Sequence, residues 1–188
     1  MLLKDINVEN NTIGYGPGGA TAFEATFYDS KAWLAQADDG QPYGVRGWHD
    51  YTDNEGNVFT VTATASHWML VQGEQDISSL ASLNRVLDQE VANLGCETAL
   101  LPFKVEGTAR VVDWSIESNP EKMTGTYHDE PIVLVGIYSS ASREAFFAVG
   151  DMNIHTHAIF PDKEFAGHVT RIEMAPDARI YQIGRAHV

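Results

Sequence analysis

The chain has 188 residues, of which 44% are hydrophobic, so it can bury a sizeable core and does not have the composition of a disordered chain. Its 26 acidic and 12 basic side chains give a formal net charge of −14, which disfavours binding to nucleic acid and to anionic membrane surfaces. No apolar run is long enough to cross a bilayer, so we expect no membrane span.

Cysteine content and charge also restrict how a metal or a ligand would be held. Cys96 is the single cysteine, which excludes an intrachain disulfide and a thiolate metal cluster. A metal would therefore depend on histidine, aspartate or glutamate. We expect a reduced cytoplasmic protein with a small-molecule substrate, because the first residues lack the apolar core of a secretion signal. The sequence leaves the oligomeric state open, a homodimer included.

Short strands are predicted along most of the chain, because period-two and β-branched runs dominate it. In chain order these runs cover residues 22–28, 32–37, 43–51, 58–66, 99–105, 108–116, 132–137, 145–149, 154–160, 168–174 and 180–183. Turn signals separate them, among them Glu106-Gly107. The glycine-rich segment GYGPGG, residues 14–19, is predicted to be a solvent-exposed turn.

The main helix is predicted at about residues 77–94. Apolar residues such as Leu80, Leu83 and Leu87 recur there at helical spacing, residues 76–79 offer capping side chains, and Gly95 is a natural stop. One helix among many short strands predicts an α+β fold: a single domain over residues 1–188 with a mostly antiparallel, barrel-like sheet.

Three histidines near the end of the chain predict a metal site. His155 and His157 are two residues apart in a predicted strand, so their imidazoles would project from one face. The polar stretch 161–164 then predicts a turn, and the hairpin would bring His168 to the first two. Taken singly, each histidine is more often an ordinary surface or core residue. Three neutral imidazoles facing one point suit Zn²⁺ or another divalent metal, with a position left open for water or substrate.

The spacing of these histidines, with ten residues between His157 and His168, resembles the metal motif of the alpha-acetolactate decarboxylases. The resemblance extends more weakly over residues 22–174, and Ala25-Thr26-Phe27 is similar to the Gly-Thr-Phe of that family. It implies a zinc-dependent, decarboxylase-like lyase in which the three-histidine metal is a Lewis acid on an oxo or hydroxy acid. Thr26 would belong to the catalytic site.

The chain departs from the family pattern where the acid–base groups are expected. It has no glutamate in register after Thr26-Phe27, and residues 111–115 stand where the family has a catalytic arginine. The family also has a C-terminal extension that supplies another glutamate, whereas this sequence stops at Val188. A proton donor would have to come from another residue. Arg143 is our candidate to supply the positive charge of the missing arginine. The candidates for proton donor are Glu24, Asp29, His67, Glu164 and Tyr138, with Glu24 and His67 preferred.

Two alternatives stay open beside the lyase. The superfamily that the resemblance implies also contains a zinc ester hydrolase branch and the plants-and-prokaryotes-conserved domains. The chain could therefore be a zinc-dependent ester or lactone hydrolase, or a non-catalytic, metal-containing binding module. Within the lyase interpretation, the substrate could be bulkier than acetolactate, because several aromatic residues are available to line a pocket. These aromatic residues are Trp33, Trp48, Trp68, Trp114 and Phe147.

Overall fold

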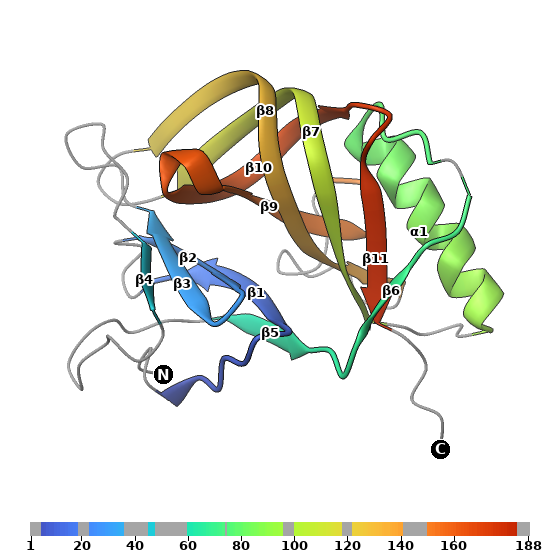
Figure 1. Ribbon diagram of the computed structural model, residues 1–188, viewed down its shortest axis with the longest axis horizontal. Helices are drawn as coiled ribbons and strands as arrows, with labels where there is room; N and C mark the ends of the chain where they lie inside the picture. The colour runs from blue at the N-terminus through green and yellow to red at the C-terminus, as the bar shows by residue number, and fades with distance from the viewer. Residues whose placement is uncertain are drawn as a thin grey trace.

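Two antiparallel sheets and one α-helix make up the computed structural model, which describes residues 5–18, 23–35, 45–47, 60–73, 75–95, 100–117, 122–140 and 150–183 (Figure 1). The small sheet has the order β4-β3-β2-β1-β5, and the large sheet has the order β10-β9-β8-β7-β11-β6. The small sheet consists of β1 (Thr12–Pro17), β2 (Glu24–Tyr28), β3 (Lys31–Ala35), β4 (Val45–Gly47) and β5 (Val61–Thr64). The large sheet consists of β6 (Trp68–Leu70), β7 (Leu100–Glu117), β8 (Lys122–Ser139), β9 (Ile154–Phe160), β10 (Phe165–Met174) and β11 (Arg179–Ile183).

Four strands of the large sheet close into a ring, because β10 pairs with β7 as well as with β9. β7 and β8 have 18 residues each and pair along their whole length, and Figure 1 shows both strands curving round. The α+β class and the antiparallel sheet are confirmed, and among the described strands the sheet closes only as this four-strand ring.

The helix α1 (Leu80–Leu94) begins three residues later than predicted. Ser79 is its N-cap and exchanges side chain–backbone hydrogen bonds with Ser82, while the carbonyl of Ile77 accepts a bond from Met174 of β10 and so lies outside the helix. Gly95 ends the helix, as predicted, and it adopts the left-handed conformation. Within the described ranges, no helix has the length and apolarity needed to cross a membrane.

The prediction of an exposed turn at residues 14–19 is wrong. Thr12–Pro17 forms β1 between β2 and β5, and Tyr15 is only 1% exposed. Gly14 permits a close approach rather than a turn: a Cβ there would lie 2.5 Å from the carbonyl oxygen of Val61 on β5. Gly19 lies outside the described residues.

The predicted turn at Glu106-Gly107 is also wrong, because β7 continues through it. Gly107 has φ +156°, and a Cβ there would lie 2.8 Å from the Cα of Ala178, so the glycine makes room for a neighbouring segment. The first half of β8 was not predicted, because Gly125 and Pro131 resemble turn residues. Gly125 instead accommodates the indole of Trp114, its partner on β7.

Two of the predicted strands fall wholly or mostly on residues that the structure does not describe. Residues 145–149 and most of 43–51 lie outside the described residues, apart from β4 at Val45–Gly47. The short strand β6 was not predicted.

The two faces of the ring strands meet different neighbours. One face carries the main hydrophobic core, which includes Phe103, Leu134 and Phe160 and packs with Leu83 and Leu87 of α1. The opposite face meets the small sheet through a second layer of side chains. That inter-sheet layer contains Ile13, Trp33, Val135, Ile159 and Ala166. The candidate site lies at this junction.

Candidate metal centre

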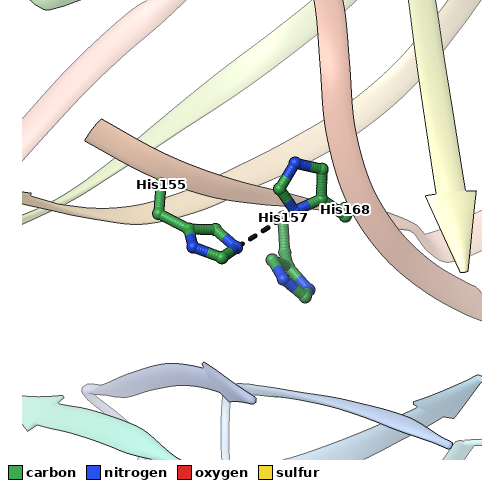
Figure 2. A group of neighbouring side chains, drawn as sticks. All are labelled: His155, His157 and His168. Carbon is green, nitrogen blue, oxygen red and sulfur yellow. Dashed lines mark hydrogen bonds between the residues drawn. The ribbon is translucent and has the colours of Figure 1, made fainter. Parts of the chain in front are cut away.

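The β9–β10 hairpin brings the three histidines together. His157 and His168 are directly opposite in the strand register, and His155 lies two residues before His157 on the same face of β9. One nitrogen from each ring can be chosen so that all three lie within 4.8 Å of one another. Figure 2 shows the three rings converging, and His168 Nδ1 lies 3.0 Å from His155 Nε2.

Burial keeps two of these rings in the neutral form that binds metals. Burial lowers the pKa of His157 well below its usual value, and the nearby His155 and His168 lower it further. Burial and His155 likewise lower the pKa of His168 to about 4. Both imidazoles are therefore neutral at pH 7, with a lone pair available for a cation.

The donor set fits a divalent metal such as zinc. A tetrahedral site with Zn–N bonds of 2.0–2.1 Å places neighbouring nitrogens about 3.3 Å apart, close to the distance between the His155 and His168 nitrogens. Among the described residues, no carboxylate joins the three histidines in this cluster. Three protein ligands and an open position are the usual arrangement of a catalytic metal rather than a structural one.

Thr26 supports the cluster from the small sheet. Its hydroxyl lies 2.9 Å from Nδ1 of His157, and both groups are buried. When the hydroxyl accepts the Nδ1 proton, the Nε2 lone pair is left for the metal, which is how ligating histidines are commonly oriented. The structure thus brings Thr26, inferred from the sequence, into contact with a metal-ligand candidate.

Glu24 lies two residues before Thr26, on the same face of β2. Its side chain is buried, with 7% exposed, and its Oε2 atom has no hydrogen-bond partner among the described residues. Burial raises the pKa of Glu24 to about 7, and the charge of Glu117 adds to this rise, whereas hydrogen bonds to the backbone of Glu117 and His168 oppose it. Glu24 therefore lies beside the backbone of His168 and carries a proton in much of the population at pH 7.

Sequence reasoning missed two residues beside the cluster. Glu117 accepts a hydrogen bond from Ser115, the register partner of His168, and forms an ion pair with Lys122, its own register partner on β8. Tyr15 lies flat against the rings of both His155 and His157. The only signal for Tyr15 was its position between two glycines, which indicated a turn instead.

The other predicted site residues lie elsewhere or outside the described ranges. His67 is exposed and pairs with Ser66 at 3.2 Å. The Tyr138 hydroxyl donates to Asp88 of α1 at 2.6 Å, on the core side of the ring. Asp29 and Glu164 are exposed and line a separate pocket of about 280 Å³. Arg143 lies outside the described residues, so its role stays a prediction.

The aromatic residues that we expected around a pocket are dispersed. Trp33 belongs to the inter-sheet layer and Trp68 packs against it, whereas Trp114 is in the main core. Trp48 and Phe147 lie outside the described residues.

Neither a protein-family model nor a curated protein matches this sequence. Solved structures do match it. A Staphylococcus aureus protein of unknown function similar to alpha-acetolactate decarboxylase is 18% identical, with a TM-score of 0.63 over 96% of this chain and 75% of that one. Alpha-acetolactate decarboxylase from Bacillus subtilis strain 168 is 12% identical, with a TM-score of 0.67 over 95% and 74%.

Acetolactate decarboxylase from Bacillus subtilis subspecies spizizenii gives a TM-score of 0.66 at 11% identity, over 95% of this chain and 75% of that one. At such identities the likeness concerns the fold. The structure itself defines an α+β protein with a three-histidine cluster on one hairpin. More particularly, the fold is that of the alpha-acetolactate decarboxylases, as the histidine spacing suggested.

Proposed function

We propose that this protein is a metal-dependent lyase that decarboxylates an oxo or hydroxy acid at a zinc ion held by His155, His157 and His168. One observation carries the proposal: three imidazoles converge beside a buried carboxyl group, in a fold shared with acetolactate decarboxylases. When bound, the zinc would act as a Lewis acid that stabilises negative charge on substrate oxygens.

The protein's own residues would position that ion and manage a proton. Thr26 holds His157 in one orientation. Loss of carbon dioxide breaks a bond to carbon and leaves its electron pair on the substrate, so a proton must be added there. Glu24 is our candidate for that proton donor, because its Oε2 is buried, has no hydrogen-bond partner in the described part of the chain, and lies on the face that bears Thr26. The carboxylate would then recover a proton from solvent.

The side chains next to the cluster bear on substrate size. Trp33 and Ile159 give the adjoining layer an apolar character. Residues 111–115 lack the arginine of the family pattern, so the site is less suited to bind a small, polar acid and better suited to bind an acid with an apolar substituent. We therefore propose a substrate bulkier than acetolactate.

A zinc-dependent ester or lactone hydrolase is the second candidate, since an open metal position could equally activate water. A hydrolase needs a nearby base to take a proton from that water. A buried carboxyl that already carries its proton is better suited to donate one. The lyase is therefore our first proposal. In a non-catalytic module we would expect a fourth protein ligand to complete the coordination of the metal.

Product analysis tests the proposal directly. Zinc-loaded protein is incubated with 2-hydroxy-3-oxo acids of increasing side-chain length, and carbon dioxide release is followed alongside a panel of aryl esters and lactones. We expect carbon dioxide from at least one acid, lost in His157→Ala and retained in His128→Ala, an exposed histidine on β8. Ester turnover without carbon dioxide would establish the hydrolase, and no turnover by metal-loaded protein would favour the binding module.

A further inference from the structure

Tyr15 is packed against two of the three histidines. Its ring centroid lies 4.5 Å from that of His155 and 4.9 Å from that of His157, with interplanar angles of 24° and 12°. The two imidazoles are themselves 5.3 Å apart and inclined by 27°. One phenol ring thus lies nearly parallel to both imidazoles, in the stacked arrangement that aromatic pairs favour.

Both ends of the Tyr15 side chain are fixed. At its backbone, β1 is paired with β2 on one side and β5 on the other, and Gly14 allows β5 to approach closely. At its hydroxyl, Tyr15 hydrogen-bonds to the backbone of Ile137, which lies opposite His155 in the β8–β9 register. The side chain therefore spans from the small sheet to the ring and has little freedom to move.

Tyr15 and Thr26 are cross-strand partners on β1 and β2. They make complementary contacts with His157, since Tyr15 covers a face of the imidazole and Thr26 bonds its Nδ1 atom. A hydrogen bond at one nitrogen still permits the ring to tilt about that bond. Contact with a fixed aromatic plane removes this tilt and applies the same constraint to His155.

We propose that Tyr15 is a positioning residue of the metal centre, whose ring holds the imidazoles of His155 and His157 in the orientation that binds the ion. The inference rests on the proposed metal site and goes beyond it by assigning a role to strand β1, in which Tyr15 lies between Gly14 and Gly16. Two physical effects support it. A ring held in place loses less conformational freedom on binding. An imidazole bound to a cation is also electron-poor, so its stacking on the electron-rich phenol face strengthens when metal binds.

Metal affinity and coordination geometry distinguish this role from simple core packing. The full-length protein is stripped of metal, zinc dissociation constants are measured by competition with a chromogenic chelator, and visible spectra are recorded with Co²⁺. Tyr15→Leu should bind zinc about 10–100-fold more weakly, as is usual when support around a metal ligand is lost, and should alter the Co²⁺ spectrum. Tyr15→Phe keeps the stacked ring and should retain the spectrum, with an affinity loss under about 10-fold.

Ile13→Ala is the matched control. Ile13 lies on the same strand, is equally buried at 1% exposed, and packs in the inter-sheet layer. We expect it to lower the unfolding midpoint while leaving zinc affinity and the Co²⁺ spectrum unchanged. Should Tyr15→Leu fail to fold, Tyr15→Met offers a flexible side chain of similar reach and carries the same expectation.

Wild-type affinity in Tyr15→Leu or Tyr15→Met would overturn the inference, as would an equal loss of affinity in Ile13→Ala. A wild-type protein that binds neither Zn²⁺ nor Co²⁺ would instead overturn the proposed metal site, so the two failures are distinguishable.

Discussion

The hydroxyl of Thr26 and the Nδ1 atom of His157 form a buried hydrogen bond of 2.9 Å across 131 residues of sequence. This bond joins the small sheet to the ring at the point where the imidazoles converge. It also decides which nitrogen of His157 faces the cluster. The folding of two distant segments against each other is therefore a condition for a correctly oriented ligand.

Replacing Thr26 by valine should weaken metal binding about 10–100-fold, because the isosteric side chain cannot fix the His157 tautomer. The variant should also lose about 1–3 kcal/mol of stability, since a buried ring nitrogen is left without a partner. Zinc competition titrations and chemical unfolding of metal-free protein measure the two effects. Thr26→Ser, which keeps the hydroxyl, is the control, and wild-type zinc affinity in Thr26→Val would contradict the prediction.

The pKa of His168 should depend on His155. In metal-free protein we expect the His168 ring to titrate near pH 4, because burial and the neighbouring His155 both disfavour the imidazolium. His155→Ala removes the contribution of His155 and should raise the titration midpoint of His168 part of the way toward 6.5. Burial still lowers the pKa in this variant, so the midpoint should stay below 6.5. Proton–nitrogen NMR titration of the histidine rings reports both values. A wild-type midpoint near 6.5 would show that His168 is not enclosed as the structure indicates.

Local sequence signals were sufficient for the metal hairpin. The two-residue spacing of His155 and His157, the polar turn and His168 together specify one face of two adjacent strands, and the structure has that hairpin. The helix was likewise predictable from the periodicity and from Gly95. Both features depend on interactions between residues close in sequence.

Local signals did not reveal Tyr15, and they did not reveal the buried environment of Glu24. Gly14 indicates a turn when only its neighbours are considered, and its close approach to Val61 depends on strand pairing 47 residues further along the chain. Glu24 was a candidate from sequence, but its burial depends on β2 packing near β7 and β10, and so does the absence of a hydrogen-bond partner for its Oε2 within the described ranges. Contacts between the two sheets, rather than signals within either, complete the candidate site.

Glu24→Gln should lower decarboxylation without removing the metal. The amide has nearly the same shape but cannot deliver a proton, and loss of general acid catalysis typically costs about 10²–10⁴-fold in rate. Zinc content and zinc affinity should stay close to wild type, because Glu24 is not one of the clustered ligand candidates. Turnover and metal content are measured on the same samples. Unchanged turnover would show that another group protonates the substrate, whereas loss of zinc would assign Glu24 to the coordination sphere.

The ionisation of Glu24 should make the free energy of unfolding depend on pH. Its pKa is about 7 when folded and near 4.5 when unfolded, so the favourable protonated form is fully present below pH 4.5 and is lost as the pH rises through 7. The uncharged amide of Glu24→Gln avoids the destabilisation that a buried carboxylate causes above its pKa. The free energy of unfolding of Glu24→Gln relative to wild type should therefore increase between pH 4.5 and 7 by about 3 kcal/mol.

Chemical unfolding of both proteins at a series of pH values measures this difference, with metal removed because a bound cation would itself lower the pKa of Glu24. Glu117→Gln gives a comparison of opposite sign at acidic pH. The pKa of Glu117 is lowered by Lys122 and Ser115 despite partial burial, so its favourable charged form is present above pH 4.5 and lost below it. Below pH 4.5, the free energy of unfolding of Glu117→Gln relative to wild type should therefore decrease as the pH rises, whereas that of Glu24→Gln increases between pH 4.5 and 7. A flat difference for Glu24→Gln would mean that the carboxyl reaches water in solution.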